Sequence, residues 1–241
     1  MRLLVVSLVS ILLSACVVLT LRYIGLSQEH MTRKHPFLSD GPIIFSVMGD
    51  SGIEEYPSLK NMAETKKRLP QIGWSLPLYI ENDSLVAKVN GQSIPLSKIL
   101  SKYPNDYYFF QIMENKENIN YLLNEQIKAF DLQERVLLFS PFRNVLLQFR
   151  ELRPHWLTGL STPEANFFLL SHKLKLETIA PFPADFLWLD IDSKVWLQDL
   201  SKDELQRRNK FLICDPLLQT RGCKAYTTDS PTTYSADLTS S

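Results

Sequence analysis

Side chains that could transfer protons near neutral pH are scarce in this chain. Such transfer needs a group that titrates near pH 7, and histidine is the usual one. None of the four histidines follows a predicted strand, which is where α/β proteins gather their reactive groups. Two lie in a polar, proline-containing segment, one precedes a predicted strand and one falls in a predicted helix: His30, His35, His155 and His172.

The remaining candidate groups are carboxylates and thiols. Asp190 and Asp192 are spaced as a pair of metal ligands, although two acids this close together in a loop are more often solvated. Cys214 and Cys223 could form a disulfide outside the cytoplasm, but we expect free buried thiols. Three cysteines in total exclude a disulfide framework as the basis of the fold.

A hydrophobic segment at residues 3–21 predicts attachment to a membrane. It has no charged residue, and as a helix it would span roughly 28 Å, close to the hydrocarbon thickness of a bilayer. One interpretation is an uncleaved signal anchor. The other is a lipoprotein signal, because Leu13-Ser14-Ala15-Cys16 resembles the bacterial lipobox and makes Cys16 the lipidation candidate. The chain stays apolar after Cys16, which favours the anchor.

Both interpretations tether the protein to a membrane through residues 3–21 and place it in a bacterial cell envelope. We expect the folded part to face the periplasm or the exterior, although basic residues on both sides of the segment leave its orientation open. The predicted division is an anchor or lipoprotein signal at 1–22, a linker at 23–41 and one domain at 42–241. The 26 basic and 26 acidic side chains cancel, which argues against general affinity for nucleic acid.

The rest of the chain alternates predicted strands with amphipathic helices. This order is typical of a parallel sheet with crossover connections, and its length suits a (β/α)₈ TIM barrel, an α/β fold, with its first two units irregular. A hairpin is predicted around Asn90-Gly91. A doubly wound sheet would want a glycine-rich first turn, which Gly49-Asp50-Ser51-Gly52 does not supply. The predicted strands are 43–47, 107–113, 135–139, 156–160, 186–189, 210–214 and 224–227, and helices are expected around 119–130, 145–152 and after Ser161.

Several segments, in order, resemble one family. IPLSKIL at 94–100 resembles its "IPTLEEVL", LQERVLLFSPF at 132–142 resembles "LEDRVLVSSF", and AYTTDSP at 225–231 resembles the closing "iiTDyP". The stretch 146–159 follows the family pattern as well. The chain from 94 to 231 thus resembles the glycerophosphodiester phosphodiesterases, a family of phospholipase-C-like barrels. The resemblance implies a barrel whose relatives hydrolyse phosphodiesters with a divalent cation and two histidines.

The family's reactive residues are largely replaced in this sequence. Its opening His-Arg-Gly corresponds to Val47-Met48-Gly49, and its Glu-Asn-Thr corresponds loosely to Glu54-Glu55-Tyr56. Its second strand carries Glu-x-Asp and then His-Asp, but 75–78 and 89–90 contain neither an acid nor a histidine. Its third strand carries Glu-x-Lys, here Gln111-Ile112-Met113. Glu114 is a poor substitute, because neighbouring strand residues point to opposite faces.

We therefore predict a degenerate phosphodiesterase-like barrel with no catalytic residue and no metal ligand, which binds a phospholipid-derived or other phosphorylated small molecule. The candidate pocket residues are Gly49, Glu54, Glu55, Gln111 and Asp229, although Asp229 is also explained as a cap for the turn after the last strand. Two alternatives stay open. One is an active enzyme with relocated ligands, which alone would need Ca²⁺ or Mg²⁺. The other is a non-catalytic scaffold that binds proteins.

Overall fold

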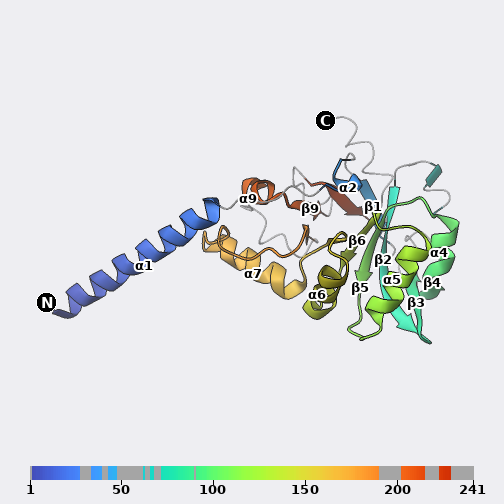
Figure 1. Ribbon diagram of the computed structural model, residues 1–241, viewed down its shortest axis with the longest axis horizontal. Helices are drawn as coiled ribbons and strands as arrows, with labels where there is room; N and C mark the ends of the chain where they lie inside the picture. The colour runs from blue at the N-terminus through green and yellow to red at the C-terminus, as the bar shows by residue number, and fades with distance from the viewer. Residues whose placement is uncertain are drawn as a thin grey trace.

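The computed structural model describes residues 2–27, 34–39, 43–47, 62, 66–67, 72–89, 91–189, 202–214 and 223–228. Within them, eight parallel strands form a barrel (Figure 1). Their order is β7-β6-β5-β2-β1-β10-β9-β8, and a parallel bridge between Gly159 and Phe186 joins β7 to β8 at the closing edge. The predicted (β/α)₈ barrel is confirmed. The strands are β1 (Ile43–Val47), β2 (Ile72–Glu81), β5 (Tyr108–Ile112), β6 (Val136–Phe139), β7 (Leu157–Thr158), β8 (Phe186–Leu189), β9 (Phe211–Cys214) and β10 (Ala225–Thr228).

The irregularity expected early in the barrel is an antiparallel extension of β2. Strand β3 (Ser84–Val89) pairs with β2 on one side and with β4 (Gln92–Pro95) on the other. Asn82 and Asp83 adopt positive φ values of 48° and 56° in the first turn, and Gly91 adopts 71° in the second. The predicted hairpin around Gly91 is therefore confirmed, and β2 is the strand that the apolar pattern missed.

Helices connect the strands. They are α4 (Leu96–Lys102), α5 (Ile119–Ala129), α6 (Arg143–Leu152), α7 (Thr162–Lys173) and α9 (Lys202–Arg207). The three helices expected around 119–130, 145–152 and after Ser161 are confirmed as α5, α6 and α7. Helix α7 begins with a capping box, in which Ser161 and Glu164 satisfy each other's backbone groups. The inner faces of α5 and α6 pack on the sheet through Leu123, Ile127 and Phe149.

Aromatic side chains fill the barrel interior toward the end at which the strands begin. Phe45, Phe109 and Phe186 face inward, where they form a buried cluster with Phe37 from the short helix α2 (Pro36–Ser39). The ring of Phe37 lies 6.3 Å from that of Phe45 and 5.6 Å from that of Phe211, and it closes the end at which the strands begin. Part of the expected linker at 23–41 thus packs into the barrel.

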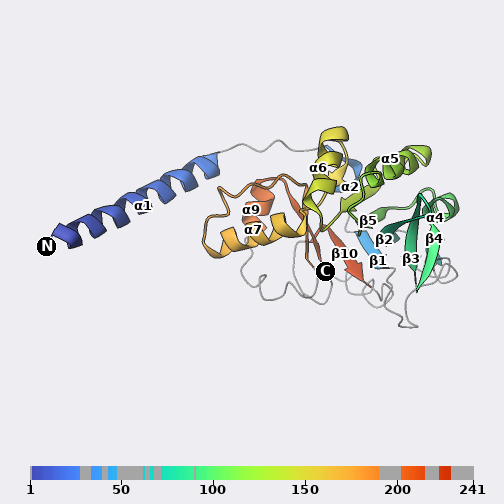
Figure 2. The same cartoon turned by 90° about the horizontal axis from the view of Figure 1, so that it is seen from below.

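Helix α1 (Arg2–Ser27) projects away from the barrel (Figures 1 and 2). It runs past Arg22, where the predicted anchor ends, to Ser27. Its segment Val9–Leu26 is long and apolar enough to cross a membrane, although a signal sequence at an N-terminus has the same properties. Cys16 is exposed on this helix as a free thiol.

Candidate functional site

In barrels of this kind the chemistry takes place where the strands end. The inward side of β2 is identified by Gly73, because a Cβ atom there would lie 2.6 Å from Cδ1 of the interior Phe45. Side chains alternate along a strand, so Ser75 and Pro77 also face inward, while Trp74, Leu76 and Leu78 pack in the outer cluster beneath the helices.

The neighbouring strand β5 contributes Gln111 to the same end of the barrel. Pro77 and Gln111 are register partners across the two parallel strands. The Gln111 side-chain amide donates a hydrogen bond of 2.8 Å to the Ser75 hydroxyl, and both side chains are buried. A neutral pair therefore joins the two strands, with Gln111 next to the last residue of β5 and Ser75 inside β2.

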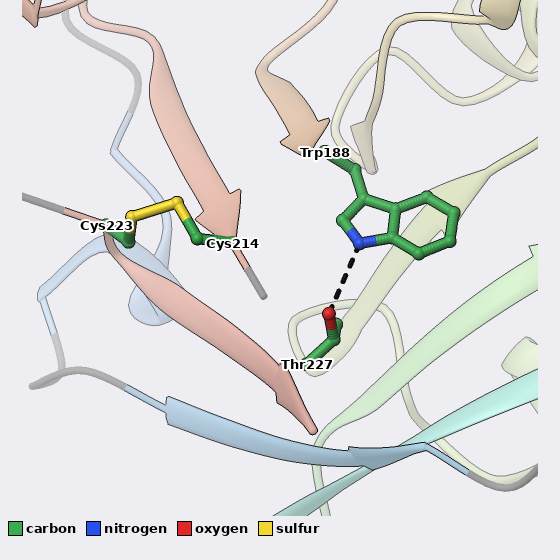
Figure 3. The surroundings of a disulfide bond; sticks show 4 residues. All are labelled: Trp188, Cys214, Cys223 and Thr227. Atoms are coloured by element: carbon green, nitrogen blue, oxygen red, sulfur yellow. Dashed lines mark hydrogen bonds between the residues drawn. A yellow bond between two sulfur atoms is a disulfide. The ribbon is translucent and has the colours of Figure 1, made fainter. Parts of the chain in front are cut away.

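An aromatic side chain covers the opposite side of this opening. The indole nitrogen of Trp188 on β8 donates a 3.3 Å hydrogen bond to the Thr227 hydroxyl on β10 (Figure 3). The same indole contacts Phe139 and Phe109 edge to face, with ring centroids 4.7 Å and 5.4 Å away. We call Ser75, Gln111, Trp188 and Thr227 the barrel mouth. None of its four side chains carries a charge.

A disulfide lies beside the barrel mouth (Figure 3). It joins Cys214, the last residue of β9, to Cys223 just before β10. The expectation of free buried thiols is therefore wrong. Spacing and hydrophobicity could not decide the question, because a buried cysteine and a buried half-cystine occupy the same kind of apolar position.

The described residues of the barrel mouth do not fit a divalent cation. Calcium and magnesium prefer several charged oxygen ligands, which offset the loss of the ion's water shell. The inward positions of β2 and of the end of β5 instead hold Ser75, Pro77, Gln111 and Met113. Within the parts of the chain that the structure describes, no group of three His, Cys, Asp or Glu side chains could hold a metal.

The predicted pocket residues are only partly placed by the structure. Gln111 lies at the barrel mouth, and its role as a ligand-binding residue stays a prediction. Gly49, Glu54, Glu55 and Asp229 lie outside the described residues, as do Asp190 and Asp192.

Glu114 and His172 are both tied to other parts of the structure. The Glu114 carboxylate accepts a 3.0 Å hydrogen bond from the Ile80 backbone and lies 2.9 Å from the Lys116 ammonium. His172 is buried on α7, 3.9 Å from Glu177.

Three residues of the barrel mouth, Ser75, Trp188 and Thr227, were not among the candidates identified from the sequence. The alternation of large apolar and small residues from 72 to 78 was the available signal for Ser75. Pro77 concealed it, because proline is uncommon inside a central strand. The Trp188 hydrogen bond joins residues 39 positions apart, and no local pattern reports such a contact.

Buried charges occur on the outer wall of the barrel. Arg150 on α6 binds the Glu164 carboxylate at 2.8 Å and also donates to the Gly159 carbonyl at 2.7 Å. Burial raises the pKa of Glu164, but hydrogen bonds from Arg150 and Ser161 outweigh that effect and hold the pKa below its ordinary value.

A second carboxylate on the outer wall is also paired with cationic side chains. The guanidinium groups of Arg207 and Arg208 overcome the opposing effect of burial and lower the pKa of Glu204. These pairs fix helices and loops rather than line the barrel mouth.

Comparison with known proteins places the fold. No protein-family model and no curated protein match this sequence. Among solved structures, a glycerophosphodiester phosphodiesterase from Parabacteroides distasonis matches with a TM-score of 0.61 and 15% identity, covering 84% of this chain and 99% of that one. The corresponding enzyme from Agrobacterium tumefaciens matches with a TM-score of 0.59 and 8% identity, over 83% and 100%.

A third similar structure contains a bound ligand. It is a phosphodiesterase from Oleispira antarctica in complex with the product sn-glycerol-3-phosphate, with a TM-score of 0.58, 13% identity and coverage of 84% and 99%. The chain therefore has the fold of the glycerophosphodiester phosphodiesterases, as the sequence resemblance predicts, at identities that establish the fold alone.

Proposed function

We propose that this protein is a membrane-tethered, glycerophosphodiester phosphodiesterase-like barrel that binds a phosphorylated, phospholipid-derived compound without hydrolysing it. The observation that carries the proposal is the hydrogen bond between Gln111 and Ser75. It places an amide and a hydroxyl on the inward sides of two adjacent strands, where the resemblance to the family would put carboxylates.

The loss of hydrolysis follows from charge and titration. A metal-assisted reaction needs anionic ligands to hold the cation, and Ser75, Pro77 and Gln111 supply none. Proton transfer needs a titrating group at the reacting ester, and among the described residues Trp188 and Thr227 occupy that end of the barrel instead. A phosphodiester held by these described side chains would meet neither anionic ligands for a cation nor a titrating base.

Binding of a phosphorylated compound is compatible with the same change. Where carboxylates are present, an anionic ligand is repelled unless a cation compensates, whereas hydroxyl and amide groups donate hydrogen bonds to a phosphate without a cation. The similar structure from Oleispira antarctica holds sn-glycerol-3-phosphate, which is the reason to choose this class of ligand.

We assign the tether to α1 and the barrel to the oxidising side of the membrane. The bridge between Cys214 and Cys223 supports that side, because disulfides persist in the periplasm and outside cells but rarely in a reducing cytoplasm. Labelling cells with a radioactive fatty acid separates the two forms of tether. We expect no label in the anchored form, whereas label that disappears in Cys16→Ser would establish a lipoprotein.

The test of function uses the full chain reconstituted in phospholipid nanodiscs. Glycerophosphocholine and glycerophosphoethanolamine are supplied with Ca²⁺ or Mg²⁺, and released glycerol 3-phosphate is measured. We expect no release above protein-free nanodiscs. Cation-dependent release that is lost in Glu54→Ala or Glu55→Ala would instead establish an active enzyme with relocated ligands.

A binding experiment addresses the ligand. Glycerol 3-phosphate should raise the melting temperature of the reconstituted protein, and inorganic phosphate and glycerol at the same concentration are the matched controls. Gln111→Leu should remove the effect. If neither glycerol 3-phosphate nor inorganic phosphate changes the melting temperature, the barrel is a scaffold rather than a binding module.

A further inference from the structure

Helix α7 is apolar on two opposite faces. Its inner face packs Phe168 and Leu169 against the barrel. Its outer face carries Phe167, Leu170 and Leu174, which are 53%, 50% and 61% exposed. Their spacing of three and four residues sets them in one stripe along the helix and its last turn. A helix on the surface of a soluble barrel normally presents polar side chains outward.

The two preceding helices follow that pattern except for one exposed residue each, Tyr121 on α5 and Leu152 at the end of α6. The outward residues of α5 include Glu125 and Lys128, and those of α6 include Asn144, Gln148 and Glu151. All three helices cover the same barrel, so the apolar exterior of α7 is a local feature. Exposed apolar residues gathered in one stripe mark a contact surface, whereas single exposed ones need no explanation.

The C-terminal end of α7 leads to the place where α1 meets the barrel. A Cβ atom on Gly25 would lie 2.3 Å from the Thr178 carbonyl oxygen, so only glycine allows this approach. Arg207 also donates a 3.4 Å hydrogen bond to the Leu26 carbonyl. Figures 1 and 2 both show α1 running outward from this side of the barrel.

The junction between α1 and the barrel is mostly apolar, although Arg208 and Lys210 also reach it. A cavity of about 330 Å³ lies between the last turns of α1 and the segment that follows α7, and both segments line it. Leu21 and Ile24 line it from α1, and Ile179 and Phe182 line it from the barrel. Ile179 is also 39% exposed, and it extends the α7 stripe toward α1.

The charges of this segment match an anionic surface. Lys173 and Lys175 are both exposed, whereas the two acids between 162 and 182, Glu164 and Glu177, are turned inward against Arg150 and His172. The segment therefore presents only positive charge beside its apolar stripe. Apolar side chains flanked by lysines are the composition that binds to the surface of a bilayer with anionic lipids.

The geometry points to the α7 surface, defined as Phe167, Leu170, Leu174 and Ile179, as a lipid-contact surface that rests in the interfacial layer of an anionic bilayer. Lys173 and Lys175 contact the headgroup phosphates. The inference rests on the proposed membrane tether, because α1 brings this surface to the bilayer. Contact at α7 would then hold the barrel in one orientation instead of leaving it to swing on α1.

The test places an environment-sensitive fluorophore on single cysteines in the full chain carrying Cys16→Ser. Leu170→Cys and Leu174→Cys report on the α7 surface, Val17→Cys reports on insertion of α1, and Glu125→Cys and Glu151→Cys are matched controls on α5 and α6. The variants are reconstituted in vesicles of phosphatidylcholine and phosphatidylglycerol. Some of the lipid carries a nitroxide near the top of its acyl chain.

We expect quenching at 170 and 174 at least about twofold greater than at 125 and 151, since interfacial helices lie about 5–10 Å into the headgroup and acyl boundary. Adding Lys173→Glu and Lys175→Glu to the Leu170→Cys variant should lower its quenching toward the value of the controls. Vesicles of phosphatidylcholine alone should have the same effect.

The other outcomes distinguish failure of this inference from failure of the proposed membrane tether. Quenching at 17 with control values at 170 and 174 would overturn the lipid contact and leave the tether intact. Control values at all positions would overturn both. Shielding of 170 and 174 without lipid quenching, together with two copies of the chain in each particle, would assign the α7 surface to a second copy and overturn the inference.

Discussion

The barrel mouth and the outer wall differ in the charge of their paired polar side chains. At the mouth, the polar contacts join neutral groups, Gln111 with Ser75 and Trp188 with Thr227. On the outer wall, carboxylates are paired with cations, as in the half-buried pair of Glu164 with Arg150 and the buried pair of Glu204 with Arg208. Among the described residues, these ion pairs therefore position helices and loops.

The two regions are therefore expected to differ in what they contribute to the stability of the barrel. The ion pairs of the outer wall hold helices and loops in place, and none of these pairs includes a residue of the barrel mouth. Substitutions at the mouth should therefore leave stability largely intact, whereas substitutions in the outer wall should be severe. The unfolding free energies of matched variants test this contrast.

The largest effect is expected for Arg208→Ala. Arg208 is buried, and its guanidinium binds Glu204 and donates to the carbonyls of Ala180 and Glu177. Removing it leaves the Glu204 charge and two carbonyl groups without that partner, which costs about 3–5 kcal/mol for a buried pair. Urea unfolding of the reconstituted chain measures it.

Arg207→Ala is the matched control, because Arg207 binds the same carboxylate but is 24% exposed. We expect it to cost about 1 kcal/mol or less. Equal losses of unfolding free energy for the two variants would contradict the conclusion that Arg208 holds the 177–180 segment in place through its hydrogen bonds.

The second effect is expected at the disulfide beside the mouth. Cys214→Ala combined with Cys223→Ala releases a cross-link between residues 9 positions apart. Loop-closure entropy gives a loss of about 2–3 kcal/mol for a loop this short. Urea unfolding with and without a reductant checks it, and an unchanged midpoint in the reductant would show that the bridge does not form.

The third effect is expected at the capping box of α7. Glu164→Gln removes the charge that Arg150 and Ser161 bind, and we expect a loss of about 1–2 kcal/mol at neutral pH. The folded-state pKa of Glu164 is lowered, so its contribution is present above the unfolded pKa and is lost as the pH falls through the folded one.

The unfolding free energies of the wild type and Glu164→Gln should therefore converge in acid. Melting curves between neutral pH and strong acid measure this convergence. A difference that stays constant with pH would contradict an ionised Glu164 in the native state.

The smallest effect is expected at the barrel mouth. Ser75→Ala removes the acceptor of the Gln111 amide and leaves one buried donor without it, which costs about 1 kcal/mol. A calorimetric melt checks the value against Ser140→Ala, which removes a buried hydroxyl bound to the Ile112 carbonyl on the neighbouring strand. A loss for Ser75→Ala as large as that for Arg208→Ala would remove the contrast between the two regions.

Much of the fold could be predicted because its signals are local. Helices α5 and α6 repeat apolar residues at helical spacing, the segment from Ser161 to Glu164 indicates the start of α7, and the Asn90-Gly91 turn identifies the hairpin. Strand β2 could not be assigned from its own pattern, since Pro77 interrupts it. The packing of Phe37 was hidden because its neighbours in the chain are polar and proline-containing.

The candidate site was less predictable because its contacts join distant positions. Gln111 was identified by its resemblance to a reactive position, but its partner Ser75 lies 36 residues earlier. The outer face of α7 escaped notice for another reason. When both faces of a helix are apolar, periodicity cannot tell which one the barrel covers.

Cation binding by the full chain tests the central claim most directly. Calcium and magnesium are titrated calorimetrically into the reconstituted wild type and into a variant that combines Ser75→Glu, Pro77→Asp and Gln111→Glu. We expect no saturable heat for the wild type and a gain of binding in the variant, because three carboxylates would then face one another at the barrel mouth. Stoichiometric binding by the wild type would contradict it.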